Sequence, residues 1–239
     1  MVLPPKPTLA EPFPPPPFTG FPPDALAFFR ELAVNNERDW FNANKARYEN
    51  SVRDPLISLA ADLTARLAKA KLSLRADPKR SMFRIHRDVR FSKDKSPYKT
   101  HASVVFSRDG EKFTPGMLYV HIDPKGSMAV SGFYMPEPPV LTKLRKALVA
   151  DAAAWAKVEA GLTRAGLTVE SNEALARVPK GFEQASAALA ETLKRKSWFV
   201  KQDLTAADIK SAALLETLAT FAGKVAPLLT FGWAAILKP

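Results

Sequence analysis

A block of consecutive strand-type segments between residues 80 and 135 sharply limits the folds open to this chain. Residues 117–122 alternate side chains between two faces, and residues 127–134 follow after Asp-Pro-Lys-Gly, which has the residue types of a type I turn. Two earlier segments, 82–89 and 102–107, are also rich in branched and aromatic residues. Three or four strands joined in chain order predict an antiparallel meander.

Helical patterns flank this block on both sides. Leucines recur with helical spacing within residues 21–72, and a capping box at Thr205 and Asp208 predicts a helix that ends at Gly223. We interpret residues 138–239 as helices with short strands, ending in a helix over 226–237. The pattern predicts a single α+β domain over residues 21–239, in which the antiparallel meander packs against N- and C-terminal helices.

The first twenty residues contain eight prolines, which predicts an extended or disordered arm rather than a folded element. They lack the continuous apolar stretch of a secretory signal, and no apolar run in the chain approaches the length of about 20 residues needed to span a bilayer. The absence of cysteine excludes disulfides and cysteine metal sites. We therefore expect a cytoplasmic protein that does not associate with membranes, and the pattern leaves its oligomeric state open.

Positive charge is concentrated in one part of the chain. The net charge is +11, and residues 75–108 contain ten Lys or Arg against three Asp. A structural ion network would need nearer parity between the charges, because an unpaired buried charge is costly. This surplus favours an anionic partner.

The segment Arg84–Lys99 is our candidate binding site for a small anion, with a phosphate-bearing ligand favoured. Arginine offers planar paired donors for phosphate, and lysine supplies mobile charge. The candidate ligand-binding residues are Arg84, Arg87, Arg90, Ser92, Lys93, Lys95, Tyr98 and Lys99.

Three alternatives to anion binding stay open. The protein would be an enzyme acting on a phosphorylated small molecule if Asp88 or Asp94 served as acid or base. It would bind nucleic acid if Phe91, Tyr98 and Tyr48 stacked on bases beside the cations. In the third alternative the segment is purely structural, with both carboxylates neutralising arginines and the aromatic rings in the core.

Three histidines raise the question of a metal. The pairs His86-x-Asp88 and His121-x-Asp123 each place an imidazole and a carboxylate on one side of a strand, and His101 lies between them in the chain. Ordinary strand alternation also produces such pairs, and nothing in the pattern brings them together. We therefore expect no metal and no other cofactor.

Four ordered motifs resemble an uncharacterised bacterial and fungal family, domain of unknown function 2461. They are FFRELAVNNERDWFNANKARYE, RIHRDVRFSKDKSPYKTH, SGFYMPEPPVLTKLR and VPKGF, which together run from about Phe21 towards the C-terminus. The resemblance implies a soluble single-domain protein whose signature is the run from Arg87 to Lys99. His86 stands where the family usually has a tyrosine.

Overall fold

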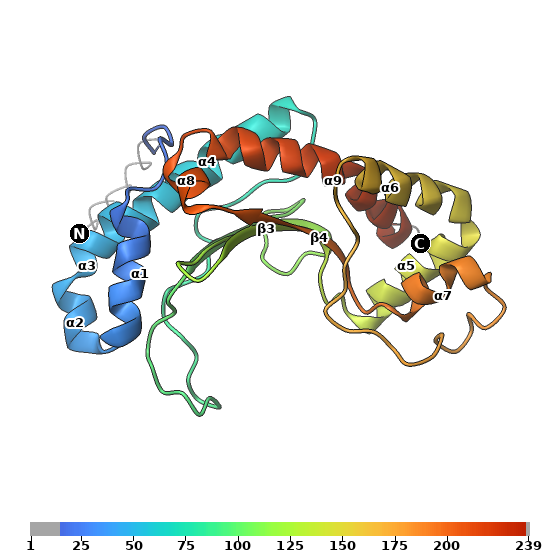
Figure 1. The fold of residues 1–239 in the computed structure, drawn as a ribbon, viewed down its shortest axis with the longest axis horizontal. Coiled ribbons are helices and arrows are strands. Elements are labelled where there is room, and N and C mark those ends of the chain that lie inside the picture. The colour runs from blue at the N-terminus through green and yellow to red at the C-terminus, as the bar shows by residue number, and fades with distance from the viewer. Residues whose placement is uncertain (1–14, 238–239) are drawn as a thin grey trace, which may run out of the picture.

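The sheet at the centre of the molecule is the meander that the sequence predicts. In a computed structural model, which describes residues 15–237, four antiparallel strands follow one another in the order β1-β2-β3-β4. Their bounds are β1 Ala102–Phe106, β2 Met117–Ile122, β3 Ser127–Phe133 and β4 Trp198–Leu204. The first three form consecutive hairpins, and β4 returns to pair with β3 after a long helical excursion (Figure 1).

Helices pack at both ends of the sheet and over one of its faces (Figure 1). The N-terminal group contains α1 Asp24–Val34, α2 Arg38–Ala43, α3 Lys45–Tyr48, the π-helical turn η1 Glu49–Arg53 and α4 Asp54–Lys69. The C-terminal group contains α5 Pro138–Ala150, α6 Ala152–Arg164, α7 Ala187–Lys194, α8 Ala206–Lys210 and α9 Leu214–Leu237. This arrangement confirms the predicted α+β class and the predicted positions of the two helical groups.

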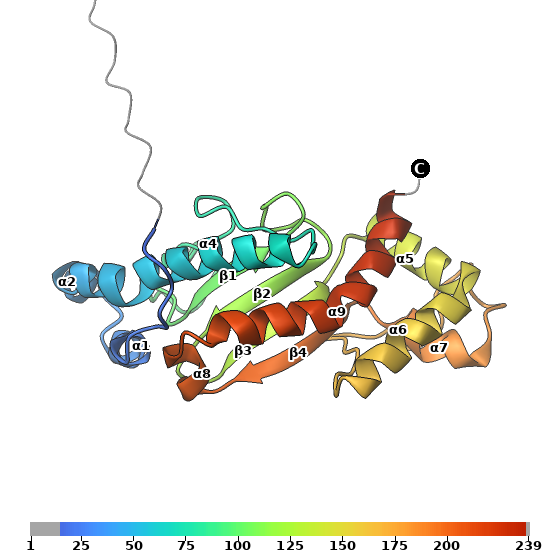
Figure 2. The same ribbon diagram turned by 90° about the horizontal axis from the view of Figure 1, so that it is seen from above.

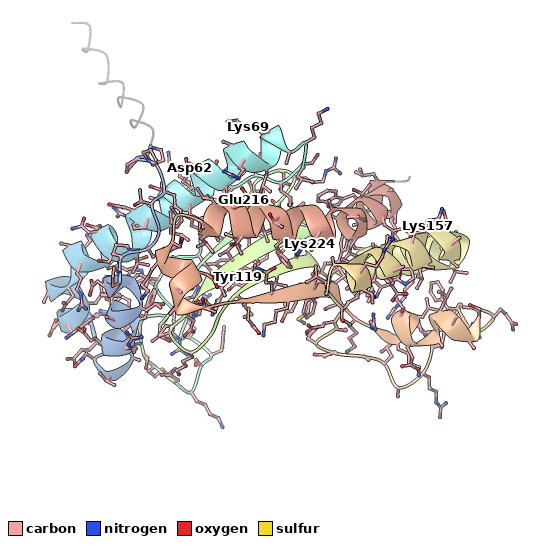
Figure 3. All side chains as sticks on the ribbon, turned by 45° about the horizontal axis from the view of Figure 1, so that its top comes forward. Asp62, Lys69, Tyr119, Lys157, Glu216 and Lys224 are labelled. Atoms are coloured by element: carbon pink, nitrogen blue, oxygen red, sulfur yellow. The ribbon has the colours of Figure 1, made fainter. Side chains whose placement is uncertain are left out.

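The helices α4 and α9 run side by side across the covered face of the sheet (Figure 2). Leu118, Val120 and Ile122 of β2 are fully buried beneath this layer, and burial of each such side chain contributes about 1.5–3 kcal/mol. Arg66 of α4 pairs with Glu216 of α9 where the two helices meet. Figure 3 labels Glu216 and Lys224 on α9 above the sheet, together with Asp62 and Lys69 on α4.

The opposite face of the sheet has no helix packed on it among the described residues (Figure 1). Alternation in β2 directs Met117, Tyr119 and His121 to this side, where they are partly exposed. In the sheet, Tyr119 lies opposite Val105 of β1 and opposite Val130 of β3. We call this surface the open face.

Two sequence-based boundaries are wrong. The segment 82–89 is not a strand, because only Met82 and His86 form isolated bridges, to Val104 and Tyr98. The helix predicted to end at Gly223 instead divides into α8 and α9, and α9 continues through Gly223 and Pro227 to Leu237. The apolar residues on both sides of Gly223 bury against the core, which outweighs the weak helix propensity of glycine.

The capping box at Thr205 is confirmed. The Thr205 hydroxyl accepts a hydrogen bond from the Asp208 amide at 3.1 Å, and the Asp208 carboxylate accepts one from the Thr205 amide at 2.7 Å. Contrary to the expectation that no apolar run approaches the length needed to span a bilayer, α9 is able to cross a membrane by length and composition. Its buried side chains, which include Leu218, Phe221 and Leu229, pack in the core.

Most of the proline-rich arm lies outside the described residues. Its last part is packed, since Phe18 is buried against Phe21 and its amide donates a 2.7 Å hydrogen bond to Asp62.

Candidate functional site

The basic segment folds as an irregular hairpin whose base lies beside β1. The Lys99 amide donates to the Ile85 carbonyl and the Arg87 amide to the Pro97 carbonyl, each at 2.8 Å. Residues 88–96 form a tip that projects away from the sheet (Figure 1). The candidate residues therefore separate into a tip group and a base group.

At the tip, the arginines are paired with the carboxylates of the same hairpin. Arg90 donates to Asp88 at 2.7 Å, and Arg87 pairs with Asp94. The hydrogen bond with Arg90 lowers the pKa of Asp88 to about 2. Hydrogen bonds with Ser96 and with Arg87 hold the pKa of Asp94 well below its usual range. Both groups are thus carboxylates at neutral pH, which disfavours a role as general acid.

The other tip side chains are mostly exposed. The Lys95 ammonium donates to the Val89 carbonyl at 3.0 Å, Ser92 lies 3.4 Å from Arg87, and Lys93 is exposed. Phe91 is 96% exposed, so it is a surface group and not part of the core.

Tyr98 anchors the hairpin to the N-terminal helices. Its ring is buried and stacks on Phe41 with the two centroids 4.2 Å apart. Both rings belong to an aromatic cluster that also contains Phe28 and Tyr48, and His86 packs against its edge. Tyr98 therefore positions the segment through packing, and its ring is not available to stack on a ligand.

At the base, Lys99 and Lys112 lie over the ring of Phe83, and the charge of Arg84 acts on Lys99 from nearby. The ammonium nitrogens of Lys99 and Lys112 lie 5.2 and 5.5 Å from the centre of the Phe83 ring. Burial lowers the pKa of Lys99, and the positive charges of Arg84 and Lys112 lower it further. Among the described residues, no carboxylate lies within ion-pair distance of these three cations.

A pocket of about 620 Å³ opens on the sheet next to this cationic group. Its wall is mostly apolar, and the volume falls in the range of about 300–1,000 Å³ typical of small-molecule sites. The residues lining it include Phe83, Lys112, Tyr119, His121, Met128, Phe133, Tyr134 and Met135. Glu137 lines it as well, so the mostly apolar wall carries one ammonium group, that of Lys112, and one carboxylate, and Lys99 lies close to the pocket across Phe83.

One wall of the pocket is held in an unusual backbone conformation. Met135 has a backbone φ of 40°, which residues other than glycine rarely adopt. The buried Ser197 hydroxyl accepts a 2.9 Å hydrogen bond from the Met135 amide. Ser197 in turn donates to Asn172 at 2.6 Å. Strain of this kind persists where the surroundings impose it, and it often marks binding sites.

Polar groups on the open face form a connected cluster. The Tyr119 hydroxyl lies 2.8 Å from Nδ1 of His121, and Nε2 of His121 lies 3.5 Å from Oδ2 of Asp123. The ring of His101 lies 4.5 Å from that of His121, measured between centroids. Figure 3 labels Tyr119 within the strand layer.

Burial sets the protonation of this cluster. It lowers the pKa of His101 to about 4, helped by the neighbouring His121, and it also lowers the pKa of His121 against the opposing effect of Asp123. Burial raises the pKa of Tyr119. Both imidazoles are therefore neutral, and Tyr119 keeps its proton, at neutral pH.

Several of these residues were missed by sequence reasoning. Phe83 directly precedes the segment Arg84–Lys99, and Lys112 lies beyond its end. Only the fold brings these two side chains next to Lys99. Tyr119 had a usable signal, because alternation in residues 117–122 places it on the same face as His121. Residues 134–137, which line the pocket, belong to the SGFYMPEPPVLTKLR motif.

The fold and the open face define an α+β protein with a pocket on the uncovered face of its antiparallel sheet. The chain belongs to the family described as conserved hypothetical protein (DUF2461), whose model matches residues 24–231. No curated protein and no solved structure matches the chain.

Proposed function

We propose that this protein binds a small anionic ligand, with phosphate as the favoured anionic group, in the pocket on the open face. Lys112, which lines the pocket, and Lys99, which lies over the adjoining Phe83 ring, contact the anion, and Arg84 adds to the positive potential. The apolar wall contacts the remainder of the ligand.

The observation that carries this proposal is the group formed by Arg84, Lys99 and Lys112, none of which has a carboxylate within ion-pair distance in the part of the chain that the structure describes. Like charges held close together disfavour each other, and a partly buried ammonium also loses hydration, so their grouping costs free energy in the unliganded protein. An anion placed between Lys99 and Lys112 would offset both costs. Both ammonium groups lie over the ring of the same phenylalanine, Phe83, which limits where the anion binds.

The hairpin tip is the other place where the same segment offers cations. There Arg87 and Arg90 already have carboxylate partners, which an anion would have to displace. The base group requires no such exchange, and this difference favours Lys99 over the arginines as the principal contact.

Calorimetric titration with phenyl phosphate tests the proposal, with inorganic phosphate and phenol as the separate halves of the probe. We expect phenyl phosphate to bind more tightly than either half. The double variant Lys99→Met and Lys112→Met should weaken it at least about tenfold, since a hydrogen bond to a charged group contributes about 1.5–3 kcal/mol.

The matched control is Arg87→Gln with Arg90→Gln, which removes the same amount of charge from the tip. It should leave the affinity within about twofold, since both arginines are paired with carboxylates at the hairpin tip and neither contacts Phe83 or lines the pocket. Loss of binding in the tip variant alone would place the anion at the tip and refute the site proposed here.

A second candidate function is nucleic-acid binding through the tip. It is favoured by the exposed Phe91 ring, with the Arg90 guanidinium 5.9 Å from the ring centre and 76% of the Arg90 side chain exposed. Such a pair offers a stacking surface beside a cation. The catalytic alternative has no comparable support, because Asp88 and Asp94 are ion-paired at the tip and do not line the pocket.

A further inference from the structure

We propose that His101, His121 and Asp123 form a binding site for a divalent transition-metal ion, with Zn²⁺ and Fe²⁺ as the favoured class. The site lies on the open face, where His121 borders the pocket. This inference does not rest on anion binding by Lys99 and Lys112, because it uses different side chains and a different ligand.

The fold brings the three side chains together from two strands and one turn. His101 directly precedes β1, and His121 in β2 pairs with Ser103 across the strand register. Asp123 follows β2 at the start of the turn to β3. One possible ligand atom from each of the three groups lies within 4.8 Å of the others.

The distances suit a metal with short bonds. Ligands about 2.0–2.2 Å from a tetrahedral zinc ion lie roughly 3.4 Å from one another. The His121 and Asp123 atoms are already 3.5 Å apart. Bringing the His101 nitrogen from the 4.8 Å limit to that separation requires an approach of at most about 1.4 Å, which a rotation of its side chain supplies.

Two of the three proposed ligands, His121 and Asp123, are oriented by hydrogen bonds to the side-chain atoms that point away from the proposed metal. The Tyr119 hydroxyl lies 2.8 Å from Nδ1 of His121, which leaves Nε2 directed towards Asp123. The Lys125 amide donates at 2.8 Å to Oδ1 of Asp123, so the other carboxylate oxygen, Oδ2, faces the histidine. Ligating groups in metal sites are held by such outer partners.

The donor set also indicates the kind of metal. Two imidazoles with one carboxylate suit Zn²⁺ or Fe²⁺, whereas an ion such as Mg²⁺ prefers oxygen ligands alone. Three protein ligands leave coordination positions for water or another ligand, which is typical of catalytic sites rather than structural ones. His121 and Asp123 are only 13% and 15% exposed in their side chains, so the site is sheltered yet reachable from the pocket.

The test uses the untagged full-length protein after removal of metal with EDTA, titrated with Co²⁺ while visible absorption is recorded. We expect a saturable ligand-field band at one Co²⁺ per chain, displaced by Zn²⁺. His101→Ala and Asp123→Asn should each weaken Co²⁺ binding at least about tenfold and alter the band.

His86→Ala is the matched control, because His86 packs on Tyr98 and Phe41 away from the cluster. It should leave Co²⁺ affinity unchanged. Tyr119→Phe keeps all three ligands and removes only the outer hydrogen bond, so we expect weaker binding with the band retained. If His101→Ala or Asp123→Asn fails to fold, as judged by circular dichroism, the Co²⁺ affinity of Tyr119→Phe still tests the metal site.

Two results would overturn the metal site. One is the absence of saturable Co²⁺ and Zn²⁺ binding by the folded wild-type protein. The other is equal loss of affinity in His86→Ala and His101→Ala. Because phenyl phosphate binding is measured on the EDTA-treated protein, failure of the metal site and failure of the anion site give separate results.

Discussion

The side-chain amide of Asn36 exchanges two hydrogen bonds with the backbone of Tyr98. Its Nδ2 donates to the Tyr98 carbonyl and its Oδ1 accepts from the Tyr98 amide, both at 3.0 Å. The side-chain amide thus forms the pair of hydrogen bonds that a neighbouring strand would form, and it connects the basic hairpin to the N-terminal helices. This contact, with the Tyr98 ring on Phe41, fixes the backbone next to Lys99, whose ammonium group lies over Phe83 at the margin of the pocket.

Asn36→Ala should therefore destabilise the protein by about 1–3 kcal/mol, because it leaves two partly buried backbone groups without partners. Urea unfolding followed by circular dichroism measures the change. The neighbouring Asn35→Ala is the control, since the Asn35 amide donates only to the exposed Glu31 carbonyl and its loss should cost much less. Equal destabilisation by the two variants would contradict a special role for Asn36.

Two glycines in α9 should respond in opposite ways to alanine. A methyl group at Gly232 would overlap the buried ring of Phe133, so Gly232→Ala should lower the free energy of unfolding by about 1–3 kcal/mol. Gly223 is exposed and has open space around it, so Gly223→Ala should raise stability by about 0.5–1 kcal/mol through helix propensity. Thermal unfolding of the two variants checks both signs.

Stability of the metal-free protein should fall as the solution is acidified from pH 6.5 towards pH 4. Burial lowers the pKa of His101 from 6.5 to about 4, so within this window the unfolded chain binds a proton that the folded chain does not. The free energy of unfolding then decreases with falling pH, and this contribution stops growing below about pH 4. Urea midpoints across the window measure the slope.

His101→Asn is the matching variant for this pH dependence. It should show a shallower fall than wild type across the same window, although the lowered pKa of His121 leaves part of the slope in place. Superimposable pH profiles for variant and wild type would show that His101 is not the group responsible.

Salt should distinguish the pocket from the hairpin tip. A compact site with two ammonium contacts should lose less than about tenfold in phenyl phosphate affinity between about 50 and 200 mM salt. A nucleic-acid surface with many phosphate contacts would lose about 10³-fold or more over that range. Fluorescence anisotropy with a single-stranded oligonucleotide measures the affinity for nucleic acid at each salt concentration. If the oligonucleotide binds through the hairpin tip, Phe91→Ala should weaken that affinity.

Alternation and turn residues were sufficient to predict the strands β2 and β3, because their spacing is local. The prediction of a strand over residues 82–89 was wrong for a physical reason. The backbone of this stretch forms hydrogen bonds with Pro97 and Lys99, on the other arm of the basic hairpin. The chain therefore turns back before a longer ladder with β1 forms. The end predicted at Gly223 failed because a local propensity was outweighed by burial on both sides.

The candidate site was harder to predict than the fold. The basic run was visible as a surplus of charge, yet its internal pairing of Arg87 with Asp94 and Arg90 with Asp88 depends on the hairpin. His101 and His121 are distant in sequence, and only the register of β1 with β2 brings them together. Contacts of this kind depend on tertiary structure and leave little trace in a single sequence.

The order of strands in the sheet has a consequence for how the protein folds. β1, β2 and β3 are neighbours in the chain, so their hairpins close short loops, whereas β4 must return across α5, α6 and α7 to pair with β3. Local pairings form faster than distant ones. We therefore expect the open face, with both histidines and the wall of the pocket nearest β2, to be assembled early, and the strand β4 to join an existing template as the slower step.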